Sequence, residues 1–282
     1  MNNRIFTIIP SWLVKSRKEL LDGCRTLEQL GFGIYNKPFL KIIPSPWNKA
    51  RQLHSAVKDK HTGIVMAQRG GYSSMKMLPY INFKLIRKYP KKYCGFSDFS
   101  TLLNSIYEKT GIITYHSPMV FNFSNPAAFT KKSFVNAMSG FPQKNLFYNA
   151  PVTVYRHGIA EGVLKGGNLI TLTALINTCW EINTDNCIIF LEDVDEKIHE
   201  VDRYLTQWVL TGKFKKVKGL VLGDFRDIDN KKVYNILKEQ LDLKFPVAHC
   251  PYIGHVKNKI TLPVGAEVEL DTYKKTLLIK KI

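Results

Sequence analysis

One serine stands where an apolar segment runs into the start of a helix. In KYCGFSDFSTLLNS, residues 92–105, the first residues are typical of a buried strand, and the helix that follows should end at Gly111. Ser97 occupies the corner between strand and helix. Its hydroxyl can cap the helix, or it can be a nucleophile if a base lies within hydrogen-bond reach. The helix N-terminus and the backbone amide of Asp98 could then stabilise a developing oxyanion.

A serine nucleophile needs a base, and the base needs a carboxylate that orients it. An apolar run, residues 187–191, leads directly into Glu192 and Asp193. An aspartate of this segment can cap the next helix, which leaves Glu192 for a site. His255 follows a glycine in a loop between two prolines. Such groups lie beyond the carboxyl ends of strands in α/β folds, so we expect these side chains to meet at Ser97.

The chain has seven histidines, and other choices of base remain open. His116 and His157 are alternative candidates for a site. Three others lie on polar stretches and are expected at the surface: His54, His61 and His199. His249, Cys250 and His255 could ligate a metal, but the five cysteines show no CxxC spacing. We therefore expect neither a metal nor a cofactor, and the odd, unpatterned cysteine count fits a reducing compartment.

A pair of glycines forms the fourth segment of interest. A predicted buried strand over 63–67 is followed closely by Arg69, Gly70, Gly71 and Tyr72. Paired glycines let backbone amides approach a ligand closely, although they also serve in a tight turn.

The elements that must position these residues alternate along the first part of the chain. Apolar runs predict strands, and amphipathic stripes predict helices between them. The predicted strands are 5–9, 63–67, the end of 92–96 and one within 111–120, and the predicted helices are 16–30, 49–57, 75–89 and the one after Ser97. This alternation predicts a mostly parallel sheet that is flanked by helices.

The pattern changes between about residues 140 and 167, where Gly, Pro and Asn are frequent and one strand is expected at 152–155. We place a linker at 146–165, between an amino-terminal α/β domain (1–145) carrying the nucleophile and a carboxy-terminal domain (166–282) carrying the acid and the base. The predicted fold class is thus α/β. Its second, smaller domain contains strands at 187–191 and 219–223, helices at 169–177, 196–210 and 233–241, and a closing β-hairpin at 266–279.

Composition limits the partners. The 41 Lys and Arg residues outnumber the 23 Asp and Glu residues, and the net charge of +18 favours anionic partners. The basic residues occur in scattered pairs, without the signature of a nucleic-acid module, so nucleic acid is not expected. No apolar run approaches the roughly 18 residues of a membrane span, and the first residues lack the pattern of a signal peptide. We expect a cytoplasmic protein without a membrane partner.

Taken together, these segments resemble one family, the LD-carboxypeptidases, which are serine peptidases and include the microcin C immunity peptidases. The family pattern runs A-x-R-G-G-Y-G, G-Y-S-D-x-T, H-G-P-M, G-G-N, L-E-D, x-D-R-x-L and G-H-x-x-N…L-P-x-G. This chain matches it in order, with Ala67, Arg69, Gly70, Gly71, Tyr72, Gly95, Ser97, Asp98, His116, Pro118, Met119, Gly166, Gly167, Asn168, Leu191, Glu192, Asp193, Asp202, Arg203, Leu205, Gly254, His255, Asn258, Leu262, Pro263 and Gly265.

The resemblance implies that Ser97 is the nucleophile, His255 the general base and acid, and Glu192 its orienting carboxylate. It also implies an oxyanion hole formed by the backbone amides of Gly71 and Asp98. The implied reaction is hydrolysis, through an acyl-enzyme and without metal, of the bond between the diamino acid and the terminal D-alanine of a murein tetrapeptide. The family also suggests a homodimer.

Substrate contacts are less defined. An exopeptidase must hold the terminal carboxylate, for which Arg69 is a candidate, and Tyr72 is a second candidate substrate contact. The chain departs from the family pattern at four positions, where other residues replace the usual Gly, Asp, Thr and Gly: Ser73, Asn82, Ser100 and Ser117.

Three other readings stay open. A microcin-immunity-type peptidase would cleave an acyl-nucleotide conjugate with the help of an extra aromatic loop. The interval between Ser97 and Glu192 leaves little room for such a loop, and Trp180 is its one tryptophan. An ordinary α/β-hydrolase shares the chain order Ser, acid, His, but the usual G-x-S-x-G is broken here. A catalytically dead relative could bind murein peptides as a sensor.

Overall fold

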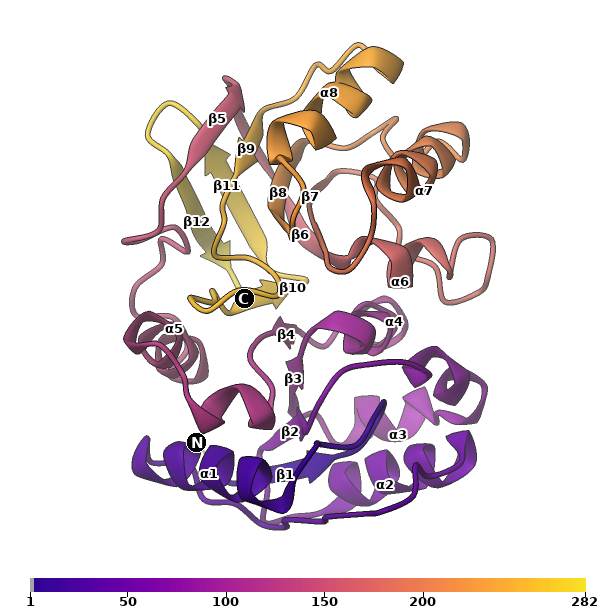
Figure 1. The fold of residues 1–282 in the computed structure, drawn as a ribbon, viewed down its shortest axis with the longest axis vertical. Coiled ribbons are helices and arrows are strands. Elements are labelled where there is room, and N and C mark those ends of the chain that lie inside the picture. Colours follow the sequence, from indigo (N-terminus) through magenta and orange to yellow (C-terminus); the bar gives the residue numbers. More distant parts are fainter. Residues whose placement is uncertain (1–2) are drawn as a thin grey trace.

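The computed structural model describes residues 3–282, and it contains two β-sheets that lie one above the other in Figure 1. The amino-terminal part of the chain, in indigo and purple, forms most of the lower layer. The carboxy-terminal part, in orange and yellow, forms most of the upper layer. Within this range, no helix has the length and apolar character needed to cross a membrane. The protein has the α/β fold that the sequence predicts.

The first sheet has the strand order β1-β2-β3-β4-β10. Its first four strands are parallel, as predicted: β1 (Ile5–Ile8), β2 (Ile64–Ala67), β3 (Lys92–Gly95) and β4 (Thr114–His116). The carboxy-terminal part of the chain adds β10 (Leu262–Val264) antiparallel to β4. The surrounding helices are α1 (Arg17–Gln29), α2 (Pro46–Lys58), α3 (Phe83–Lys88), α4 (Ser100–Thr110) and α5 (Ala128–Met138). The strand β10 thus carries the segment after His255 back to the first sheet.

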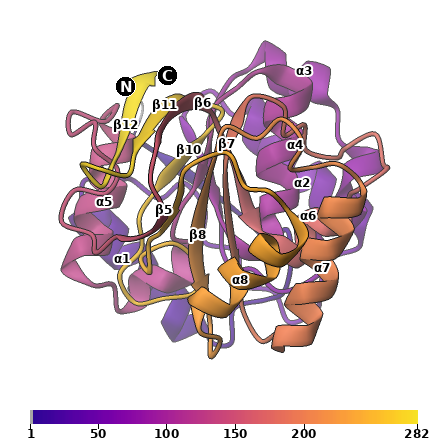
Figure 2. The same ribbon diagram turned by 90° about the horizontal axis from the view of Figure 1, so that it is seen from above.

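The second sheet has the order β12-β11-β6-β7-β8-β9-β5. Its strands are β5 (Thr153–Arg156), β6 (Ile159–Asn168), β7 (Cys187–Asp193), β8 (Gly219–Phe225), β9 (Val247–His249), β11 (Glu267–Asp271) and β12 (Thr276–Lys281). The strands β6 to β9 are parallel, and β11 and β12 form the predicted closing hairpin. The helices of this part are α6 (Leu169–Thr173), α7 (Ile198–Leu210) and α8 (Asn230–Gln240); α7 and α8 lie on one face of the sheet (Figure 2).

Helix ends follow local sequence signals. The side chain of Ser16 accepts a hydrogen bond from the backbone N–H of Glu19 and starts α1. Gly111 adopts the left-handed conformation that ends α4, as predicted. The helix predicted at 75–89 is wrong in one respect, because it is broken in two. A 3₁₀ helix covers Ser74–Tyr80 and contains Pro79, and α3 begins after Asn82, whose side chain accepts from Leu85 N–H.

The glycine-rich segment before residue 168 is a strand that the sequence did not predict. Gly162 and Gly166 allow β6 to approach its neighbour closely. A Cβ on Gly166 would lie 1.8 Å from the carbonyl oxygen of Phe190, and one on Gly162 would lie 2.6 Å from that of Asn186. Glycine here marks close strand packing rather than a loop. The expected linker, 146–165, therefore contains β5 and most of β6, and the domain limits stay a prediction.

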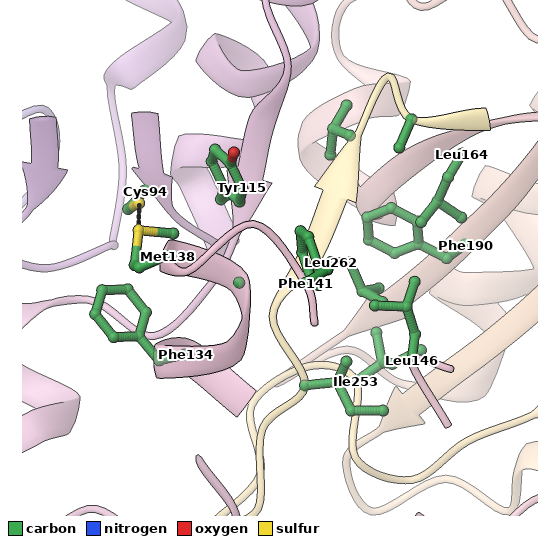
Figure 3. Close-up of a cluster of buried hydrophobic side chains, with 14 of the residues drawn as sticks. Cys94, Tyr115, Phe134, Met138, Phe141, Leu146, Leu164, Phe190, Ile253 and Leu262 are labelled. Atoms are coloured by element: carbon green, nitrogen blue, oxygen red, sulfur yellow. Dashed lines mark hydrogen bonds between the residues drawn. The ribbon is translucent and has the colours of Figure 1, made fainter. Parts of the chain in front are cut away.

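A buried apolar cluster joins the two layers (Figure 3). Tyr115 and Cys94 contribute to it from the first sheet, and Phe190 and Leu164 contribute from the second. Helix α5 adds Met138. Burial of apolar area stabilises a fold by roughly 25 cal/mol per Å², so a shared cluster of this kind resists separation of the layers. The cluster therefore fixes the position of the carboxyl end of β3 relative to that of β7.

Candidate active site

Ser97 lies at a strained corner, two residues after the end of β3. Its φ angle is +62°, in the left-handed region that side chains other than glycine rarely adopt. Such a conformation costs a non-glycine residue about 1 kcal/mol and is typical of functional corners. The backbone of Gly70 lies against it, since a Cβ added to Gly70 would be 3.0 Å from both Cβ and Oγ of Ser97. The predicted corner is confirmed, and the glycine turn lies beside the serine hydroxyl.

Glu192 and His255 meet in the fold. Glu192 is the next-to-last residue of β7 and has no exposed surface. Its Oε2 lies 2.8 Å from Nδ1 of His255, in the loop between β9 and β10. Burial raises the pKa of Glu192, but the charge of His255 and the hydrogen bond to it outweigh this effect and hold that pKa below its ordinary value. A carboxylate that accepts from Nδ1–H leaves Nε2 as the basic nitrogen.

Ser97 and His255 line one cleft of about 530 Å³. The other residues predicted for the site also line it: Asp98, Gly71, Arg69 and Tyr72. Glu192 lies behind His255, outside the cleft lining. Within residues 3–282 no hydrogen bond joins Ser97 Oγ to His255; in ligand-free enzymes this contact is often long and shortens when substrate binds. The fold thus brings all the predicted site residues to one place.

The two predicted oxyanion donors face this cleft on separate segments. Gly71 has φ +128°, and a Cβ there would lie 2.5 Å from the ring of Trp12, so this position requires glycine. Among the described residues, the N–H groups of Gly71 and Asp98 donate to no protein acceptor. The carboxylate of Asp98 accepts from the hydroxyl of Ser11 and, at 2.8 Å, from the N–H of Ser74. These bonds hold the helix start against the glycine turn.

Ser73, at a glycine position of the family, has φ +93° and a buried partner. Its Oγ accepts a hydrogen bond of 2.7 Å from Nζ of Lys49, which also donates to the carbonyl oxygen of Ser11 at 2.9 Å. Burial lowers the pKa of Lys49, and the charge of Asp98 opposes this. Lys49 therefore links Ser73, which follows the glycine turn, to Ser11, whose hydroxyl donates to Asp98. No sequence signal marks this role, because Lys49 lies in a segment with the pattern of an amphipathic helix.

A second buried lysine, Lys259, lies close to the Glu192–His255 pair. Nζ of Lys259 donates to the carbonyl oxygen of Gly254 at 2.9 Å and lies 4.6 Å from the centre of the Phe96 ring. That ring packs against the ring of His255 at 4.7 Å. Burial lowers the pKa of Lys259 to about 8, and the charge of Glu192 opposes this. Lys259 thus contacts the residue before the candidate base and the residue before the candidate nucleophile.

The alternative histidines lie elsewhere. His116 is 2% exposed, packs against Phe190 below the site, and does not line the cleft. Burial lowers the pKa of His116 to about 4. His157 stacks on Tyr273 of the hairpin turn with ring centres 5.0 Å apart. His255 is therefore the candidate base that the geometry favours.

The remaining motif residues support the cleft wall. Nδ2 of Asn168 donates to Asp193 at 2.8 Å, and Asp193 also accepts from the N–H of Ile170. Burial, and then the charge of Glu192, raise the pKa of Asp193 to about 7. Ser100, at a family threonine position, accepts from the N–H of Asn168 at 3.2 Å. Asp193 thus organises the start of α6, which precedes β7 in the chain. The expectation that an aspartate of this segment caps the next helix is wrong, because Lys197 is the N-cap residue of α7. Glu192 is paired with His255.

Metal ligands do not gather in the part of the chain that the structure describes. No group of three His, Cys, Asp or Glu side chains there could hold a metal ion. Of the imagined ligand set, His249 lies against the ring of Tyr155, and His255 is paired with Glu192.

Sequence comparison identifies both halves of the chain. The LD-carboxypeptidase N-terminal domain matches residues 5–117, and the LD-carboxypeptidase C-terminal domain matches residues 161–270. This chain belongs to the LD-carboxypeptidase family. The family assignment that its motifs predict is confirmed, and with it the class of enzyme, a serine-type carboxypeptidase.

Individual relatives agree with this assignment. A probable murein peptide carboxypeptidase of Bacillus subtilis is 32% identical over 281 residues, which cover 93% of this chain and 87% of the relative. The microcin C7 self-immunity protein MccF of Escherichia coli is 29% identical, with 82% of this chain and 77% of MccF covered. The crystal structure of a muramoyltetrapeptide carboxypeptidase from Oxalobacter formigenes has a TM-score of 0.82 at 27% identity, with 97% of each chain covered.

Proposed function

We propose that this LD-carboxypeptidase releases the terminal D-alanine from murein tetrapeptides by hydrolysing the L,D-peptide bond through an acyl-enzyme on Ser97. The hydrogen bond between Glu192 and His255, at the rim of the cleft that holds Ser97, is the observation that carries the proposal. It supplies an oriented base to a serine at a helix start. The names of the relatives from Bacillus and Oxalobacter point to the same class of substrate.

In the proposed mechanism, Nε2 of His255 takes the proton of the Ser97 hydroxyl while Oγ attacks the carbonyl carbon of the diamino acid. The oxyanion is bound by the N–H groups of Gly71 and Asp98. The carbon–nitrogen bond then breaks as His255 gives this proton to the leaving amine of D-alanine. A water molecule attacks the ester after losing a proton to His255, and this proton returns to Ser97 as the tripeptide leaves.

The ionised Glu192 stabilises the imidazolium that forms twice in this cycle. It remains a carboxylate throughout, because its pKa is held below the ordinary value. Lys49 holds the segment of the glycine turn, and Lys259 holds the carbonyl group of the residue before His255. The oxyanion donors and the base therefore need little reorganisation during the reaction.

The second candidate is cleavage of an acyl-nucleotide conjugate. Trp12 and Tyr72 favour it, since both are about half exposed at the cleft and could stack on a nucleobase. MccF is also a relative of this chain. However, Trp180 packs against the core beside α4 instead of facing the cleft. The murein peptide remains the favoured substrate.

The test is a comparison of two substrates with the same enzyme preparation. We would incubate the protein with a murein tetrapeptide and, separately, with an aminoacyl adenylate analogue that carries a hydrolysable amide, and follow products by mass spectrometry. The proposal predicts loss of one D-alanine from the tetrapeptide and little cleavage of the analogue. A tetrapeptide that ends in L-alanine is the matched control and should stay intact. Cleavage of the analogue alone would replace the murein proposal by the second candidate.

We also propose that the protein is a cytoplasmic homodimer without nucleic-acid or membrane partners. A hydrodynamic measurement of mass would test the dimer directly.

A further inference from the structure

Arg226 is a cleft residue that the sequence did not indicate. It follows β8 directly, and its backbone N–H donates to the carbonyl oxygen of Asp193 at the end of β7. Its side chain lines the cleft and is 45% exposed. An arginine in a loop of a lysine-rich chain has no sequence pattern that marks it as functional.

The guanidinium of Arg226 is fixed to the residue that carries the base. Nη2 donates to the backbone carbonyl oxygen of His255 at 2.6 Å. Nη1 lies 4.0 Å from a carboxylate oxygen of Asp195, whose side chain is largely exposed, and such a pair contributes little. Guanidinium has several further N–H donors in one plane, so Arg226 keeps donors for a ligand in the cleft.

The reaction places a carboxylate close to this group. His255 must protonate the leaving amine, and the terminal carboxylate is attached to the carbon next to that nitrogen. The carboxylate therefore lies within roughly 4 Å of the amine by covalent geometry alone. The residues just after β7 that line the same cleft carry negative charge: Asp193, Asp195 and Glu196. Arg226 is therefore a cation that lines the cleft next to His255 and has unused N–H donors.

Arg69, the candidate from the sequence, is engaged differently. Its Nη1 donates to the carbonyl oxygen of Leu13 at 2.9 Å, and its guanidinium lies 5.9 Å from the centre of the Trp12 ring. It comes from the segment that carries the glycine turn, and no hydrogen bond between described residues joins its guanidinium to the His255 loop.

We propose that Arg226 binds the terminal carboxylate of the substrate and so restricts the enzyme to the last peptide bond. This inference rests on the proposed tetrapeptide activity and adds the group that makes the enzyme an exopeptidase. A planar arginine suits a carboxylate, because two parallel hydrogen bonds can form.

The test compares a murein tetrapeptide with the same peptide bearing a terminal carboxamide. For the wild type, kcat/KM should be roughly 10- to 100-fold higher for the free acid, as expected for a charge-assisted hydrogen-bond pair. Arg226→Gln should lose most of this preference, because kcat/KM should fall much further for the free acid than for the amide. Far-UV circular dichroism and the urea midpoint of the variant serve as the folding control. Arg226→Lys should give an intermediate preference, and Arg69→Gln, the matched control, should keep the full preference.

Two results would overturn the inference while the proposed function stands. One is an equal loss on both peptides in Arg226→Gln and Arg226→Lys, since Arg226 would then act only by holding the His255 loop. The other is loss of the preference in Arg69→Gln instead. A wild type that cleaves neither peptide would remove the tetrapeptide activity itself, and the role of Arg226 with it.

Discussion

Oε2 of Glu192 lies 2.8 Å from Nδ1 of His255, although 63 residues separate them in the chain. Glu192 is fully buried at the end of a parallel strand, and His255 is in a loop that returns to the other sheet. The relative position of the two sheets therefore fixes the orientation of the His255 ring, the proposed base.

Glu192→Gln should lower kcat by roughly 10³- to 10⁴-fold with little change in KM, as for the loss of an orienting carboxylate in other triads. The amide would favour the imidazole tautomer with its proton on Nε2, which cannot accept a proton from Ser97. Glu192→Asp keeps the charge with a shorter reach and should fall in between. Steady-state kinetics on the tetrapeptide measures kcat and KM of both variants. A loss of less than tenfold in kcat for Glu192→Gln would show that the Glu192–His255 hydrogen bond is not needed for catalysis.

Ser97→Gly and Ser97→Ala should both be inactive but should differ in stability. Alanine keeps a Cβ at φ +62°, whereas glycine adopts this conformation without strain. The glycine variant should be more stable by about 1 kcal/mol, measured as the free energy of unfolding in urea. The opposite order would show that the corner relaxes when the hydroxyl is removed.

Ser73 offers a similar comparison with a charged partner. Ser73→Ala removes the acceptor of Lys49 and keeps the left-handed conformation, so it should destabilise the protein by about 2 kcal/mol. Ser73→Gly also removes the acceptor but relieves the strain, and should be about 1 kcal/mol more stable than the alanine variant. Urea unfolding gives both values. A glycine variant more stable than the wild type would mean that the bond to Lys49 stabilises the fold by less than the strain at Ser73 costs.

Lys259 should make stability depend on pH in the alkaline range. Its pKa is lowered to about 8 in the fold and returns to about 10.5 on unfolding, so the unfolded chain binds more protons between these values. The free energy of unfolding of the wild type should therefore rise relative to that of Lys259→Met as pH increases from 8 to 10.5. Urea unfolding of both proteins at three pH values tests this, and parallel curves would exclude a lowered pKa.

Much of the site could be predicted because its residues follow strands. Ser97 and Glu192 stand where apolar runs end, and the order of the motifs resembles one family over nearly the whole chain. His255 could be predicted as the base because it follows a glycine in a loop and matches the same family pattern. The parallel first sheet could be predicted because apolar strand segments alternate with amphipathic helices, and hydrophobic periodicity distinguishes these two kinds of segment.

The parts that were missed depend on tertiary contacts. The glycines of β6 signal a loop locally but meet the backbone of β7 in the fold. The strand β10 has three residues, too few for a periodic pattern, although it joins the second part of the chain to the first sheet. Lys49, Lys259 and Arg226 function through partners far away in sequence, which no local pattern reveals.

The most direct test of the central proposal is the rate of D-alanine release from a murein tetrapeptide by the wild type and by Ser97→Ala. Far-UV circular dichroism and the urea midpoint of the variant serve as the folding control. The proposal predicts that kcat falls by about 10⁴-fold or more, because the acyl-enzyme cannot form without the hydroxyl. A folded Ser97→Ala that retains kcat within tenfold of the wild type would contradict the assignment of Ser97 as the nucleophile.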